Sequence, residues 1–158
     1  LLLFSCIKDD ESETINYINV KSQIPTFAVE DTAGNTFSSK QFIGKQSLLV
    51  FFGTYCPDCK QVLPVIEEVW KELKDDPKFL LVTISRKETA EAVSNYWEEN
   101  QFTMPFYLDT RGEVFSLFAN NTIPRIYIIN PDNEVVWMAV ESLDISAKEL
   151  IQKIKGLK

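Results

Sequence analysis

The chain has 158 residues, 45% of them hydrophobic, a length that closes one sizeable core and does not require a second domain. Its 16 basic and 23 acidic residues give a net charge of −7, which opposes binding to the phosphate backbone of a nucleic acid. Histidine is absent and cysteines number only three, so the sequence excludes a Ser-His-Asp triad, a histidine-ligated metal and a four-thiolate zinc site, and we expect no metal or other cofactor.

The N-terminus is four apolar residues followed by Ser5 and Cys6, after which the chain turns polar. This stretch is too short to span a membrane and is typical of the end of a signal peptide. Residues 3–6 resemble the lipobox of bacterial lipoproteins, and residues 6–10 resemble the signal that sends Bacteroidetes lipoproteins to the cell surface. We therefore expect an acylated Cys6 that anchors the protein to the bacterial membrane, on the periplasmic side or at the cell surface. The alternative is a short hydrophobic strand that carries a plain thiol.

The residues that follow Cys6 are charged and show no apolar period, so they cannot support a core. We interpret residues 1–22 as a signal-peptide remnant, a lipidation site and a flexible tether. The folded domain is predicted to span residues 23–158.

The first half of this domain predicts a hairpin, a central strand and a helix. Residues 24–29 and 36–37 alternate in polarity around a turn, as in a β-hairpin. Residues 48–52 form a continuous apolar run, which is typical of a strand covered on both faces. From Cys59 to Leu73 the apolar residues recur every three or four positions, so one helix face packs inward and Glu67 and Glu68 are expected in water.

The second half predicts alternating elements and then a second hairpin. The expected elements are strands at 79–84, 106–108, 125–129 and 134–138, and helices at 90–100 and 113–118. Ser146 and Glu149 form a capping box at the start of a last helix. This order indicates an α/β fold, a central mixed sheet flanked by helices on both faces.

Two cysteines stand where the central strand meets the first helix, in the motif Cys56-Pro57-Asp58-Cys59. Their spacing brings both sulfurs to one side of the first helical turn, close enough for a disulfide. A helix N-terminus stabilises a thiolate, so we predict that Cys56 attacks and Cys59 resolves. Pro57 suits the first helical position, whereas the Asp58 carboxylate disfavours a nearby thiolate and predicts a mild or reducing couple.

The domain resembles the extracytoplasmic thiol-disulfide oxidoreductases of the TlpA/ResA type, which have a thioredoxin-like fold. The resemblance rests on these residues taken together: Pro25-x-Phe27, Gly44-Lys45, Cys56-Pro57-Asp58-Cys59, Pro64 and Thr122-Ile123-Pro124. It implies a cis Pro124, an Ile123 backbone that pairs with substrate beside the disulfide, and the extra helix and strand of the TlpA group. Tyr55 replaces the tryptophan usual before the motif. The implied partners are protein thiols and disulfides and an unidentified redox partner, with the protein acting as a monomer.

Several features of related proteins are missing. Val50 and Val62 stand where thioredoxin and ResA-like proteins have carboxylates, so the proton acceptor for Cys59 stays open. A peroxiredoxin-like peroxidase is one alternative, although Gly53 and Leu49 replace the threonine and proline that it needs. The other is a thioredoxin-fold binding protein with a structural disulfide. A copper-delivery protein of this fold would need three residues between its cysteines and a histidine, and this chain has neither.

Overall fold

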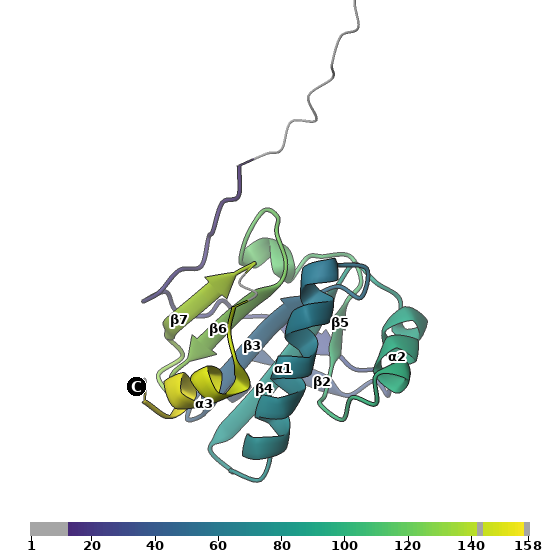
Figure 1. Ribbon diagram of the computed structural model, residues 1–158. Helices are drawn as coiled ribbons and strands as arrows, with labels where there is room; N and C mark the ends of the chain where they lie inside the picture. The colour runs from purple at the N-terminus through teal and green to yellow at the C-terminus, as the bar shows by residue number, and fades with distance from the viewer. Residues whose placement is uncertain (1–12, 142–143, 157–158) are drawn as a thin grey trace, which may run out of the picture.

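Figure 1 shows the computed structural model of the protein, which describes residues 13–141 and 144–156. A seven-stranded sheet forms the centre of the domain. The strands are β1 Ala28–Glu30, β2 Thr36–Ser38, β3 Gln46–Phe52, β4 Phe79–Arg86, β5 Tyr107–Asp109, β6 Arg125–Ile129 and β7 Val135–Val140. The helices are α1 Pro57–Leu73, α2 Ala90–Glu99 and α3 Ala147–Gly156, with 3-10 helices η1 Ser39–Phe42 and η2 Phe115–Leu117.

The strand order is β2-β1-β5-β4-β3-β6-β7. β3 pairs in parallel with β4 and antiparallel with β6, and β4 pairs in parallel with β5. Two antiparallel hairpins, β1–β2 and β6–β7, complete the edges. The predicted α/β fold with a mixed sheet and an N-terminal hairpin is confirmed.

The central strand β3 is buried along almost its whole length, from Ser47 to Phe52. Successive side chains of a strand point to opposite faces, so Leu48 and Val50 enter one core while Leu49 and Phe51 enter the other. The strand is therefore fixed on both sides. This packing fixes the position of its last residue, Phe52, where the loop that leads to Cys56 begins.

The two faces of the sheet are covered in different ways. Buried residues of all three α-helices share one core, and α1 and α3 lie in front of the sheet in Figure 1. The other core is built around Phe51, whose ring contacts those of Phe115 and Phe118, and is covered by η1, η2 and the chain before β1. Helices thus flank both faces as predicted, but on the second face they are short 3-10 turns, and the helix expected at 113–118 is reduced to η2.

Residues 13–23, here called the N-terminal segment, differ from the expected flexible tether. The Tyr17 amide donates to the Phe118 carbonyl at 2.8 Å, and the Lys21 amide donates to the Val135 carbonyl at 2.8 Å. Ile18 packs against the core around Phe51. Backbone hydrogen bonds and one apolar side chain hold the segment on the domain. Such contacts produce no periodic pattern of apolar residues, so the sequence did not predict them.

Candidate functional site

The site is built at the start of α1. Cys56 is the N-cap of this helix, and its Sγ accepts a hydrogen bond from the Cys59 amide at 3.2 Å. Pro57 occupies the predicted first helical position, where a missing N–H costs nothing. Both cysteines are free thiols, with Cys56 half-buried and Cys59 fully buried. The structure therefore brings the predicted pair together as a dithiol in which only Cys56 can meet another molecule.

Burial sets the chemistry of the second thiol. Removal from water raises the pKa of Cys59, and the hydrogen bond with Cys56 and the negative charges of Cys56 and Asp58 raise it further. Cys59 therefore stays protonated at neutral pH in the reduced protein. The roles of Cys56 as the attacking thiol and Cys59 as the resolving thiol stay a prediction, for which this difference in burial is the structural basis.

The predicted substrate loop lies against the first thiol. The Ile123–Pro124 peptide bond is cis, as the resemblance implied, and Pro124 is buried. Cys56 Sγ lies 3.8 Å from the Ile123 carbonyl oxygen, within hydrogen-bond range for sulfur. Residues 67 positions apart in the sequence thus form one site.

Tyr55 stands at the rim of the site. The residue is 57% exposed, and its hydroxyl donates to the Arg86 carbonyl at 3.3 Å. A Cβ atom at Gly53 would lie only 2.7 Å from this ring, closer than real contacts allow. The Cys56 amide donates to the Gly53 carbonyl, so the loop turns back at Gly53, next to the Tyr55 ring. Glycine fits this turn because it has no Cβ atom to clash with the ring.

Sequence reasoning missed Glu88, which follows the end of β4. Glu88 is only 9% exposed, and its carboxylate accepts hydrogen bonds from the Thr54 amide at 3.0 Å and from the Ser85 hydroxyl at 2.6 Å. The Thr54 hydroxyl also donates to it. Glu88 thereby ties β4 to the loop before Cys56. Its signal in the sequence is its place just beyond the carboxyl end of a buried strand, where α/β proteins build their sites.

The carboxylates expected from related proteins are replaced by buried apolar side chains, since Val50 is 0% and Val62 is 2% exposed. Cys6 lies outside the described residues. Within residues 13–141 and 144–156, no cluster of three or more candidate ligands is arranged to hold a metal ion. In the same part of the chain no helix has the length and apolar character needed to cross a bilayer.

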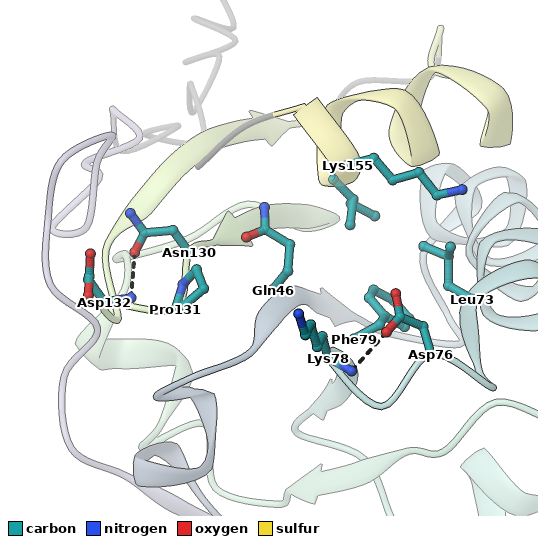
Figure 2. Close-up of a pocket in the computed structure, with 10 residues that line it drawn as sticks. Gln46, Leu73, Asp76, Lys78, Phe79, Asn130, Pro131, Asp132 and Lys155 are labelled. Atoms are coloured by element: carbon teal, nitrogen blue, oxygen red, sulfur yellow. Dashed lines mark hydrogen bonds between the residues drawn. The ribbon is translucent and has the colours of Figure 1, made fainter.

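A cavity of about 430 Å³ lies at the other end of the sheet (Figure 2). It is lined by Gln46 and Phe79 at the starts of β3 and β4, by Leu73 at the end of α1, and by Pro131 in the β6–β7 turn. The thiols follow the opposite end of β3, which at about 3.3 Å per residue is roughly 20 Å away. The cavity is therefore not part of the thiol site.

Comparison with known proteins agrees with this geometry. A family model described as Redoxin matches residues 19–151. The thiol-disulfide oxidoreductase ResA of Bacillus subtilis (strain 168) is 30% identical over 119 residues, which cover 75% of this chain and 66% of that protein. ResA of Bacillus thuringiensis subsp. konkukian is 26% identical, over 75% of this chain and 68% of its own length. The matched region thus spans about two thirds of these relatives.

Solved structures show the same fold. A candidate protein disulfide isomerase from Bacteroides thetaiotaomicron has a TM-score of 0.81 and 26% identity, over 87% of this chain and 89% of that one. A thiol:disulfide interchange protein of the thioredoxin family from Chlorobium tepidum TLS has a TM-score of 0.73 and 25% identity, over 85% and 94%. The family match, the relatives and the shared fold agree, and the chain therefore belongs to the Redoxin family, alongside the thiol-disulfide oxidoreductases of the ResA type.

Proposed function

We propose that the protein is a thiol-disulfide oxidoreductase that reduces disulfides of exported proteins through Cys56 and Cys59. The observation that carries the proposal is the arrangement of one accessible thiol at a helix N-terminus, beside a buried second thiol and the Ile123 carbonyl. Unpaired N–H groups and the helix dipole stabilise a thiolate at this position, and the thiolate is the form that attacks a disulfide.

The reaction is an exchange in two steps. The Cys56 thiolate attacks one sulfur of the substrate disulfide, so a Cys56–substrate disulfide forms and the other substrate sulfur leaves as a thiolate that takes up a proton. Cys59 then loses its proton and attacks Cys56 Sγ, which releases the second substrate thiol and leaves a Cys56–Cys59 disulfide. Two electrons pass from the protein to the substrate, and an unidentified redox partner must return them.

The substrate segment is expected to lie across the loop that carries Ile123 and Pro124. Ile123 is next to Cys56 Sγ, so a peptide backbone that pairs with it would place its own sulfur near the attacking thiol. The exposed ring of Tyr55 offers an apolar contact on the rim. This arrangement favours a polypeptide disulfide over a small isolated one.

The reducing direction rests on Asp58, the acidic residue in the first turn of α1. A carboxylate near Cys56 disfavours the thiolate, which makes the reduced form less stable and the potential lower. The residues before Cys56 do not support the peroxidase alternative. Gly53 and Leu49, both buried, occupy the positions where a peroxiredoxin-like peroxidase needs a threonine and a proline.

The location is proposed from the N-terminal residues and from the extracytoplasmic family that the domain resembles. An acylated Cys6 would anchor the protein, as a monomer, on the periplasmic side of a membrane or at the cell surface. Incorporation of labelled palmitate that is lost in Cys6→Ala would support the anchor, and unchanged labelling would overturn it.

The activity is tested by equilibrating the full chain with glutathione and dithiothreitol buffers. Thiol trapping followed by peptide mapping distinguishes Cys56 and Cys59 from Cys6. We expect a reversible two-electron couple below about −200 mV. A couple near about −120 mV, in the range of strong oxidants, would reverse the direction, and a bond that resists reduction would make the disulfide structural.

A further inference from the structure

Arg125, the first residue of β6, is a buried cation without an anionic partner in the described part of the chain. It is 0% exposed, and the ion pairs among the described residues join other side chains. A buried charge is costly unless hydrogen bonds satisfy it. The hydrogen bonds that Arg125 makes offset this cost, and they show which parts of the chain it joins.

Arg125 binds the backbone of the loop that reaches Cys56. Its Nε donates to the Thr122 carbonyl at 2.7 Å, and its Nη2 donates to the Asn121 carbonyl at 2.8 Å. Thr122 has a φ of 77°, a conformation that a residue with a side chain rarely adopts without support. The next residue is Ile123, whose carbonyl lies beside Cys56 Sγ. The guanidinium thus fixes the two residues that precede the substrate-binding position.

The same guanidinium also reaches the N-terminal segment. Its Nη1 donates to Asn16 Oδ1 at 2.7 Å. Around this contact the segment is joined to the loop in both directions, because the Ile15 amide donates to Asn120 Oδ1 at 2.7 Å and Asn120 Nδ2 donates to the Glu13 carbonyl at 2.9 Å. The Asn120 amide donates to the Ile15 carbonyl at 3.3 Å. Residues 13–16 therefore line one side of the loop.

We propose that residues 13–16 and Arg125 form a brace that positions the backbone of residues 121–123 beside Cys56. The N-terminal segment is then a working part of the active site and not only a connection to an anchor. Asn16 and Arg125 are positioning residues, since neither is placed to touch the substrate sulfur. The catalytic consequence of the brace rests on the proposed function, whereas its effect on the loop does not.

The test compares three full-length variants. Asn16→Ala removes the acceptor for Arg125, and Asn16→Asp keeps an oxygen at the same place. Ser22→Ala is the matched control, because it removes one hydrogen bond from the same segment, that of the Asn19 amide to Ser22 Oγ at 3.0 Å, far from the loop. The first measurement is the rate constant at which the reduced protein reduces a cyclic peptide with one disulfide.

Asn16→Ala is expected to lower this rate constant about tenfold, the effect of losing one hydrogen bond to a charged group. Asn16→Asp should restore it, and Ser22→Ala should leave it within about twofold. Alkylation of Cys56 by iodoacetamide, which needs no backbone partner, should also stay within about twofold. An equal loss in Asn16→Ala and Ser22→Ala would overturn the brace.

Amide hydrogen exchange distinguishes the brace from the proposed function. Residues 119–123 should exchange at least about tenfold faster in Asn16→Ala than in the wild type or in Ser22→Ala, because the loop loses its support. If the wild type reduced no disulfide but this difference appeared, the proposed function would fail and the brace would stand. Unchanged exchange would refute the brace whatever the activity.

Discussion

Because the fold raises the pKa of Cys59, we expect the protein to lose stability in alkaline solution. Because burial holds the pKa of the folded thiol above that of the unfolded chain, the contribution to stability is fully present below the unfolded value and is lost as the pH rises above it. The pKa of a cysteine in an unfolded chain is about 8.5. Above this pH the unfolded state releases a proton that the folded state keeps, so the free energy of unfolding should fall by about 1.4 kcal/mol per pH unit.

The contribution of Cys59 can be isolated with two variants. Cys56→Ser prevents a disulfide within the pair and leaves Cys59 free, and Cys56→Ser/Cys59→Ala removes the second thiol as well. Tyrosines and lysines titrate alike in both, so the difference between their stabilities reports Cys59 alone. From pH 8.5 to pH 10.5 the single variant should lose about 2 kcal/mol more than the double variant. Urea unfolding under reducing conditions at several pH values measures this difference.

Parallel loss of stability in the two variants would refute the reasoning. It would mean that Cys59 ionises as easily in the fold as in the unfolded chain, which its full burial opposes. The resolving role would then need no special proton acceptor. A constant offset between the variants is expected in any case, because the cavity left by Cys59→Ala does not depend on pH.

Three further substitutions test the structure around the site. Glu88→Ala should destabilise the protein by about 2 kcal/mol in urea unfolding, because it leaves buried donors of Thr54 and Ser85 unpaired, whereas exposed Glu91→Ala should cost little. Gly53→Ala should lower the free energy of unfolding by about 1–3 kcal/mol, because the new Cβ atom would lie 2.7 Å from the Tyr55 ring. If Gly53→Ala cost as much stability in a Tyr55→Ala background as in the wild type, this clash could not be the cause. Glu67→Ala should cost about 3 kcal/mol, because three donors at residues 103–104 lose their acceptor, and a loss no larger than that of exposed Glu68→Ala would show that those bonds contribute nothing.

The elements that sequence patterns predicted are those marked by local signals, such as an apolar run or a helix cap. The run at 48–52 became the central strand, and the capping box of Ser146 and Glu149 is observed, with the Glu149 amide donating to Ser146 Oγ at 3.1 Å. The motif at 56–59 was placed correctly because a helix start needs a cap and tolerates proline at its first position. Local rules therefore sufficed for the redox pair itself.

Contacts between distant polar groups could not be predicted in this way. Glu67 was expected in water, yet the residue is only 5% exposed and its carboxylate accepts a hydrogen bond from the Met104 amide at 3.0 Å. Glu88 and Arg125 likewise bind loop backbone that is distant from Glu88 in the sequence and, for Arg125, is brought to the side chain only by the folded loop. A charged side chain in a sequence gives no sign of the unpaired backbone group that it will meet.

The missing carboxylates and the coupling of the two thiols together suggest how resolution proceeds. With Val50 and Val62 buried, no carboxylate at those two positions can take the Cys59 proton. Two of the causes that raise the pKa of Cys59 nevertheless depend on Cys56, namely their hydrogen bond and the negative charge of the Cys56 thiolate. Both vanish once Cys56 is bonded to a substrate sulfur, so Cys59 becomes easier to ionise at the step that needs its thiolate, and the departing substrate thiolate is a base formed at that same step. Burial, the largest cause, stays, so we expect resolution to be the slow step and the mixed disulfide to accumulate at low pH.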